Sequence, residues 1–224
     1  MKALIFDSGA LINLSMNGLL YLLKKLKENC DCKFLITKEV KYEVVDRPIG
    51  INRFELGALR VQNLIDTGIL ETPSSLNISE EKMNAKTNEL MEIANHSVEI
   101  NRKWVKIVSE GEMSCLALSS ELSKIGIKNL IAIDERTTRI LSENPENLGK
   151  IMSDKMHRNV RAEFEKLKAF SEFKFIRSSE LVYVAYKKEL IELKGKKVLE
   201  ALLYATKFKG AAISFEEIDV IKKL

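Results

Sequence analysis

Four short apolar runs constrain the fold of this chain more than any other feature. They occupy residues 2–6, 33–36, 130–133 and 173–176. Such short apolar runs are typical of buried strands, and the longer stretches between them repeat apolar residues at helical spacing. Strands that alternate with amphipathic helices indicate a parallel sheet covered on both faces. The sequence therefore predicts an α/β fold, namely a three-layer α/β/α sandwich around a central parallel sheet, with extra helices.

Helical periodicity accounts for most of the remaining residues. Helices are expected at 10–27, 37–46, 52–66, 79–108, 109–126, 137–141, 150–171, 195–207 and 215–223. Small polar residues stand where helix N-caps are expected, namely Thr37, Ser79, Ser109 and either Ser178 or Ser179. Trp104 falls at helical spacing within 79–108, which is typical of a core or interface residue, whereas an exposed ring would be able to stack on a base.

The composition fits one enlarged domain better than two domains on a flexible tether. The chain has 224 residues with three prolines and ten glycines, and no linker-like segment interrupts it. Its three cysteines do not suggest a disulfide framework, and one Cys-x-Cys argues against structural zinc. The amino terminus lacks a secretory signal pattern, and no apolar run is long enough to span a bilayer. We therefore expect a cytoplasmic protein with no membrane partner.

The charge is distributed unevenly along the chain. The net charge is +4, but residues 1–150 hold 20 Lys and Arg against 21 Asp and Glu, whereas residues 151–224 hold 16 against 11. A basic second part suits a polyanionic partner such as nucleic acid. The same side chains would equally form an ordinary solvated surface, so charge alone leaves both interpretations open.

Four acidic residues occupy positions that a parallel sheet would bring together. Asp7 follows the first apolar run and Asp134 follows the third. Glu43 lies in the helix after the second run, and Glu112 lies in the first turn of the helix that leads to the third. Ligands of such sheets bind outside the carboxyl ends of the strands. We therefore expect the four carboxylates to converge at that edge.

Each of these acids also has a purely structural interpretation. Asp7 and Asp134 precede helices and are natural N-caps. Glu112 completes a Ser-x-x-Glu capping box. Glu43 is the least secure of the four, because it could be a plain surface glutamate and because Glu39 shares its helix face.

Taken together, the four acids require a positive counter-charge, because carboxylates that lie close together repel one another. No lysine or histidine stands at an obvious position to supply it. A hard divalent cation with oxygen ligands would do so. Such an ion acidifies a bound water and stabilises charge on a phosphate, which allows phosphodiester hydrolysis without a nucleophilic side chain.

The segments around these acids resemble the motifs of PIN-domain proteins, a family of small α/β metal-dependent nucleases. The resembling segments are 6–12 with Asp7 and Ser8, 40–44 with Glu43, 111–118 with Glu112, and 133–139 with Asp134, Glu135 and Arg139. Residues 175–181 resemble the family's last strand and helix and would place Ser178 near the site. Glu135 stands where the family more often has a second aspartate.

The resemblance implies a PIN-like domain over residues 1–191, with helical insertions at about 77–108 and 142–172, and a helical extension at 192–224. It further implies an endoribonuclease that cleaves single-stranded RNA with Mg²⁺ or Mn²⁺. The implied catalytic residues are Asp7, Glu43, Glu112 and Asp134. The implied metal ligands are Asp7, Glu112, Asp134 and Glu135. The residues expected to contact substrate are Ser8, Arg136, Arg139 and Ser178. A homodimer and an antitoxin protein are the partners that the family suggests.

Two other functions stay open at this point. A catalytically silent RNA-binding or assembly protein would keep the fold without cleaving RNA. The segment 6–10 also resembles the nucleophile strand of haloacid-dehalogenase phosphatases, but Gly9 stands where those enzymes need a second aspartate. A small-molecule phosphohydrolase is therefore the least favoured of the three.

Overall fold

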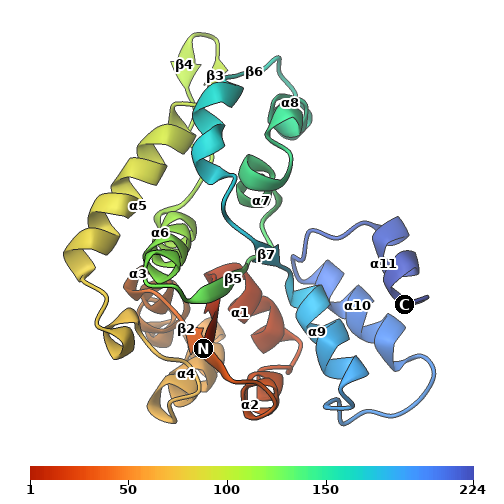
Figure 1. The fold of residues 1–224 in the computed structure, drawn as a ribbon. Helices are drawn as coiled ribbons and strands as arrows, with labels where there is room; N and C mark the ends of the chain where they lie inside the picture. Colours follow the sequence, from red (N-terminus) through yellow and green to blue (C-terminus); the bar gives the residue numbers. More distant parts are fainter.

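The four apolar runs form the central sheet of the computed structural model, which describes all 224 residues (Figure 1). The strands are β1 (Lys2–Phe6), β2 (Cys32–Leu35), β5 (Lys128–Ala132) and β7 (Phe175–Ile176). They are all parallel and lie in the order β2-β1-β5-β7. Phe6 pairs with Ala132, so the acidic residues that follow β1 and β5 lie at the same edge of the sheet.

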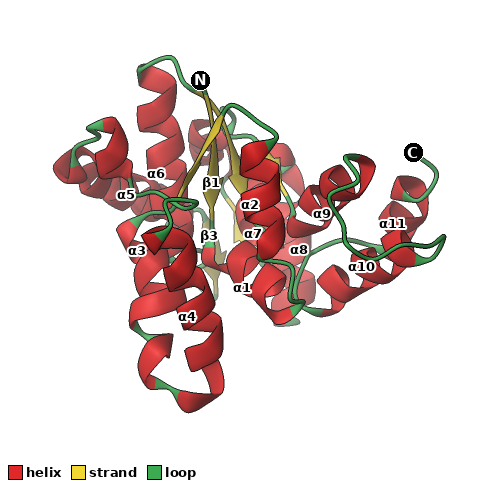
Figure 2. Cartoon of the chain, turned by 90° about the horizontal axis from the view of Figure 1, so that it is seen from below, coloured by secondary structure: helices red, strands yellow, loops and turns green.

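Helices cover both faces of this sheet, which confirms the predicted three-layer α/β/α sandwich. Figure 2 shows α5 and α6 on one side of β1, with α2 and α9 on the other. The helices are α1 (Ser8–Met16), α2 (Tyr21–Glu28), α3 (Lys38–Lys41), α4 (Asn52–Asp66), α5 (Glu80–Asn95), α6 (Glu110–Lys124), α7 (Arg136–Glu143), α8 (Leu148–Met156), α9 (Ser178–Lys187), α10 (Val198–Phe208) and α11 (Phe215–Ile221). The strands and the inner helix faces share one cluster of 48 buried apolar residues.

Most of the predicted helix starts are confirmed. The Thr37 hydroxyl accepts from the amide of Val40 at the start of α3, and Ser79 caps α5 in the same way. Ser109 forms a complete capping box at the start of α6. The predicted cap at Ser178 or Ser179 is wrong by a residue or two, because Arg177 holds the N-cap position of α9 and Ser178 is already helical.

Two of the long predicted helices are interrupted. The helix expected at 10–27 is broken into α1 and α2, because Gly18 adopts a left-handed conformation with φ of 68° and reverses the chain between them. The segment 150–171 contains only the short helix α8, which ends at His157 with φ of 52°. A two-residue strand and a 3₁₀ helix at Phe164–Phe170 follow.

A second, smaller sheet replaces the end of the helix expected at 79–108. Helix α5 ends at Asn95, and β3 (Val98–Ile100), β4 (Lys103–Trp104) and β6 (Arg161–Ala162) form an antiparallel sheet in the order β4-β3-β6. Asn101 and Arg102 both have positive φ, of 51° and 61°. Two consecutive residues of this kind form the tight turn that matches the twist of a β-hairpin.

The last thirty residues build a small helical unit against α9. Helix α10 lies beside α9 and α11 lies beside α10 (Figure 1), and these helices enclose their own apolar cluster. That cluster consists of Leu199, Leu203, Ala211, Ile213, Ile218 and Ile221. None of the helices in the structure is both long enough and apolar enough to cross a membrane.

Candidate active site at the carboxyl edge of the sheet

Asp7 is the most deeply placed acid at the carboxyl edge. It follows β1 and caps α1, because its Oδ2 accepts a 3.0 Å hydrogen bond from the amide of Gly9. The residue is only 3% exposed. Its other carboxylate oxygen, Oδ1, is buried and has no hydrogen-bond partner. Buried polar atoms nearly always have a partner, so this oxygen is an exception that calls for an explanation.

The surroundings of Asp7 disfavour its ionised form. Burial and, after it, the charge of Glu112 raise the pKa of Asp7 from 3.8 to about 7, and Glu43 adds to the rise. The amide of Gly9 acts in the opposite direction by bonding the carboxylate. The carboxyl group therefore holds a proton, or needs a cation, at a pH where an ordinary aspartate needs neither.

Glu112 serves as a helix cap and also faces the other acids. Its Oε2 accepts from the amide of Ser109 and from the Thr138 hydroxyl, both at 2.9 Å. Both bonds use Oε2, so Oε1 remains available. Burial raises the pKa of Glu112, and the charges of Glu135 and Glu43 raise it further. The capping interpretation is thus confirmed without excluding a second role.

Glu43 reaches the same place from the opposite side. It lies in a π-helical segment, Tyr42–Asp46, that continues α3, and such segments are frequent at functional sites. A Cβ atom placed on Gly111 would lie 2.9 Å from Oε1 of Glu43. The glycine before Glu112 therefore leaves the space that the Glu43 carboxylate occupies. Asp46, by contrast, is exposed and pairs with Lys41 at 3.2 Å.

This close approach predicts the effect of Gly111→Ala. The new methyl group would displace the flexible end of Glu43, so we expect Mn²⁺ affinity to fall about tenfold or more. The fold should be retained, because alanine is favoured over glycine in a helix by roughly 1 kcal/mol. Calorimetric titration with Mn²⁺ would measure the change. The control is Gly149→Ala in α8, where the nearest neighbour of the added Cβ lies at 3.7 Å. Equal affinity in the two variants would place Glu43 outside any metal site.

Asp134 is held by three hydrogen bonds. Oδ1 accepts from the amide of Ser178 at 2.8 Å, and Oδ2 accepts from the Ser178 hydroxyl at 2.7 Å and from Nδ2 of Asn13 at 2.9 Å. The interpretation of Asp134 as the N-cap of the next helix is wrong. Glu135 caps α7 instead, accepting from the amide of Thr138 at 2.9 Å. Ser178 therefore lies directly beside Asp134.

Asn13 is a member of the site that the sequence analysis missed. It is fully buried in α1 and bridges two parts of the chain, because Nδ2 donates both to Asp134 and to the carbonyl of Thr206 in α10. The sequence did contain an indication of this role, because Asn13 places a side-chain amide on the face of the first helix that packs against the core. A buried amide must be hydrogen-bonded, so such a residue marks a polar contact inside the fold.

The two arginines expected to contact substrate lie in different environments. Arg136 is exposed at the start of α7, next to Glu135, and Ser8 is half-buried beside Asp7. Arg139 is only 9% exposed and donates to the carbonyl of Ala212 at 3.1 Å. The amide of Ala212 in turn donates to the carbonyl of Asp134. The carboxyl-terminal unit is therefore fastened directly to the loop that carries Asp134.

As placed, these side chains do not form a metal-binding geometry. No group of three or more His, Cys, Asp or Glu side chains is arranged to hold a metal ion. The reason is visible in the contacts, because Glu112, Asp134 and Glu135 direct oxygens toward their helix caps and hydroxyl partners. The structure thus brings Asp7, Glu43 and Glu112 into electrostatic contact and holds Asp134 against Ser178 and Asn13.

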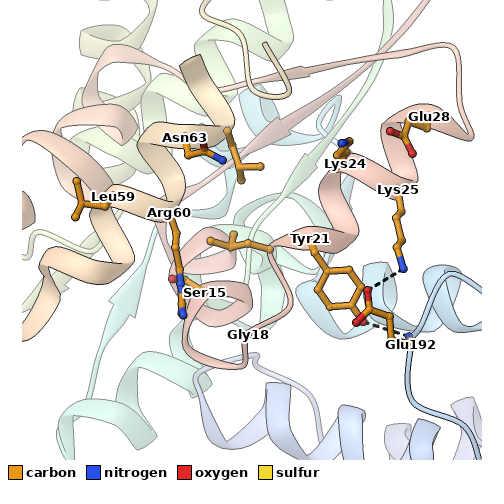
Figure 3. Close-up of a pocket in the computed structure, with 12 residues that line it drawn as sticks. Ser15, Gly18, Tyr21, Lys24, Lys25, Glu28, Leu59, Arg60, Asn63 and Glu192 are labelled. Carbon is orange, nitrogen blue, oxygen red and sulfur yellow. Dashed lines mark hydrogen bonds and ion pairs between the residues drawn. The ribbon is translucent and has the colours of Figure 1, made fainter. Parts of the chain in front are cut away.

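A well-defined cavity lies away from these acids. It has a volume of about 800 Å³ and opens between α2, α4 and the loop after α1. Figure 3 shows Arg60 beside Ser15 and Lys25 reaching Glu192 along its wall. None of the residues predicted for catalysis, metal binding or substrate contact lines it. The acidic site is therefore an edge of the sheet and not part of this cavity.

No protein-family model matches the chain, and neither a curated protein nor a solved structure matches it. The resemblance to PIN-domain proteins rests on the sequence motifs alone.

Proposed function

We propose that the protein is a divalent-metal-dependent endoribonuclease that hydrolyses single-stranded RNA at the carboxyl edge of its sheet. The observation that carries the proposal is the buried Oδ1 of Asp7, which lacks a partner in a region where Glu112 and Glu43 add further negative charge. A buried, unpaired carboxylate oxygen costs free energy until a proton or a cation satisfies it. A hard cation such as Mg²⁺ or Mn²⁺ matches an all-carboxylate donor set.

The donor chemistry of these residues suits such an ion, and their carboxylates would turn toward it on binding. Asp7 offers Oδ1 and Glu112 offers Oε1, neither of which has a hydrogen bond. Asp134 and Glu135 are the further ligands in the proposal, with Glu43 against Gly111 as a neighbouring charge. When bound, the ion would supply an acidified water and would neutralise charge on the scissile phosphate.

The other residues of the site would position these groups. Ser178 and Asn13 fix the carboxylate of Asp134, and Thr138 fixes that of Glu112. Exposed Arg136 would hold a phosphate of the RNA backbone. Buried Arg139 would act indirectly, through its bond to the loop of the carboxyl-terminal unit.

A catalytically silent RNA-binding or assembly protein is the second candidate. It is favoured by the structural bonds of Glu112, Asp134 and Glu135, which account for these residues without a metal. In either role, a homodimer and an antitoxin partner belong to the same proposal as expectations from the PIN resemblance. A cytoplasmic location belongs to it as the expectation from the sequence pattern.

A circular single-stranded RNA, which has no ends, tests the proposal directly. After removal of metal with a chelator, we expect no cleavage. Addition of Mg²⁺ or Mn²⁺ should restore linearisation followed by shorter fragments, resolved on a denaturing gel, while duplex RNA is spared. Binding without cleavage in either metal would favour the silent alternative. Cleavage that persists at full rate in excess chelator would overturn the metal dependence, and turnover of a phosphomonoester with no action on RNA would indicate a phosphohydrolase.

A further inference from the structure

The small sheet β4-β3-β6 displays an aromatic ring to solvent. Trp104 is the only tryptophan of the chain, and it lies on β4 with 43% of its surface exposed. Large aromatic side chains are usually mostly buried. One end of the ring is contacted by His96 at a centroid distance of 5.6 Å, and Nζ of Lys166 lies 5.1 Å from the ring centroid. The ring is therefore held in a defined orientation while a large part of it faces solvent.

The strand register places a cation in the same row as this ring. Glu99 pairs with Trp104 on one side and with Arg161 on the other. Directly paired residues share a face of the sheet, so Trp104 and Arg161 flank Glu99 on one face. Val98 pairs with Ala162 on the opposite face and is fully buried. The face that carries Trp104 is thus the outward one.

Positive charge is concentrated around this sheet. The segments 96–106 and 157–168 contain seven Lys and Arg against three Asp and Glu, a balance of +4, which equals the net charge of the whole chain. All seven cations are exposed, but Lys103 pairs with Ile100 and so lies on the other face of the sheet. We call Trp104 and the remaining cations the basic sheet surface; these cations are Arg102, Lys106, Arg158, Arg161, Lys166 and Lys168. Only Lys166 and Lys168 form ion pairs, with Glu163 and Glu165. The other four cations of this surface form no ion pair and can meet an anionic partner.

The basic sheet surface is joined to the acidic site along two chain segments. Only four residues separate Trp104 from Ser109, and Ser109 caps the helix that carries Glu112. Even in a fully extended chain, Trp104 and Ser109 would lie within roughly 17 Å of each other. On the other side, β6 follows α8, and Nζ of Lys155 in α8 lies 3.4 Å from Oε1 of Glu135. Figure 1 shows β6 next to α8. A ligand bound on the basic sheet surface would thus lie close to the acids.

We propose that the basic sheet surface binds single-stranded RNA, with a base stacked on Trp104 and phosphates held by Arg161 and its neighbours. An exposed ring among unpaired cations is the combination that single-stranded nucleic acids use, because bases stack on the ring and phosphates pair with the cations. The inference rests on the proposed function, since it assigns the RNA contacts of the same site. It adds a binding surface outside the acidic edge.

Intrinsic fluorescence tests the proposal without any substitution, because Trp104 is the sole tryptophan. Wild-type protein in chelator is titrated with a fluorescein-labelled 12-nucleotide single-stranded RNA at low salt. We expect tryptophan quenching and fluorescence anisotropy to give the same dissociation constant. Two results would overturn the proposal. One is RNA binding that changes the anisotropy but leaves the tryptophan emission unchanged. The other is polyglutamate that quenches the tryptophan as strongly as RNA does and displaces the RNA completely.

Matched variants separate stacking from charge. Trp104→Ala should weaken RNA binding about 5- to 150-fold, which corresponds to the loss of one stacked base, and Trp104→Phe should retain most of the affinity. In the triple variant, Arg102, Lys106 and Arg161 are replaced together by serine. The slope of the logarithm of the binding constant against the logarithm of the salt concentration should become shallower by about two. The control replaces three exposed lysines of the carboxyl-terminal part by serine, namely Lys194, Lys196 and Lys209. Equal slopes in the two triple variants would contradict the proposal.

The two proposals fail in different ways. Because RNA binding is measured without metal, a protein that quenches and binds but never cleaves would support the surface and overturn the nuclease. A protein that cleaves RNA with Mn²⁺, with a KM unchanged in Trp104→Ala, would support the nuclease and overturn the surface.

Discussion

Asp7→Asn is expected to reduce metal-dependent RNA cleavage at least about a thousandfold while the fold stays intact. Asparagine has the shape of aspartate, and its side-chain oxygen can still accept from the amide of Gly9 and cap α1. It lacks the negative charge on the buried oxygen that has no partner. A metal ion stabilises developing charge by several kcal/mol, and a loss of about 4 kcal/mol corresponds to a factor of about a thousand in rate.

Asp46→Asn is the matched control for this prediction. It removes the same charge from the segment that carries Glu43, but Asp46 is exposed and pairs with Lys41. We expect cleavage by this variant to stay within about twofold of wild type, since exposed ion pairs contribute little. Initial rates with Mn²⁺, and a far-ultraviolet circular dichroism spectrum for each variant, would settle the comparison. Full activity of Asp7→Asn would remove Asp7 from the reaction.

The central sheet and the Ser109 capping box followed from the sequence because both depend on local patterns. A strand of five residues that ends at Phe6, just before Asp7, fixes which edge that acid occupies once the strands are parallel. The Ser109 capping box is similarly local, because its two partners are three residues apart. Such features need no knowledge of distant contacts, which explains why these predictions were confirmed.

The features that were mispredicted depend on competition between patterns or on distant contacts. Val98 and Trp104 fit helical spacing, but the alternation of Val98, Glu99 and Ile100 and the tolerance of Asn101 for positive φ favour a hairpin. The role of Asn13 depends on Asp134, which is 121 residues away. No local pattern could reveal that bond.

The same distant contacts explain the placement of Arg139. Its position within the fourth motif suggested a phosphate contact, but its guanidinium is buried against the carbonyl of Ala212, 73 residues further along the chain. Arg177 donates to the same carbonyl and pairs with Glu217 of α11. The carboxyl-terminal unit thus accepts hydrogen bonds from two arginines of the sheet domain, and this could not be predicted without knowing where that unit packs.

The metal-free protein should lose stability as the pH rises from about 4 to about 7. The pKa of Asp7 is raised from 3.8 to about 7 in the folded state, so between these values the folded protein holds one more proton than the unfolded chain. The free energy of unfolding then falls by about 1.4 kcal/mol for each pH unit. The total is on the order of 4 kcal/mol at pH 8, and the raised pKa of Glu112 acts in the same direction.

Urea unfolding in chelator between pH 4 and 8.5 would measure this effect, with Asp7→Asn as the reference. Because the variant cannot ionise at this position, its stability relative to wild type should increase through the same pH range and level off above pH 7. A divalent cation bound by the ionised carboxylate would oppose the trend, because it stabilises the folded state by mass action. Saturating Mn²⁺ should therefore restore wild-type stability above pH 7 and do much less for the variant. A stability difference that does not change with pH would mean that Asp7 ionises normally in the fold, and the unpaired buried oxygen would then no longer call for a cation.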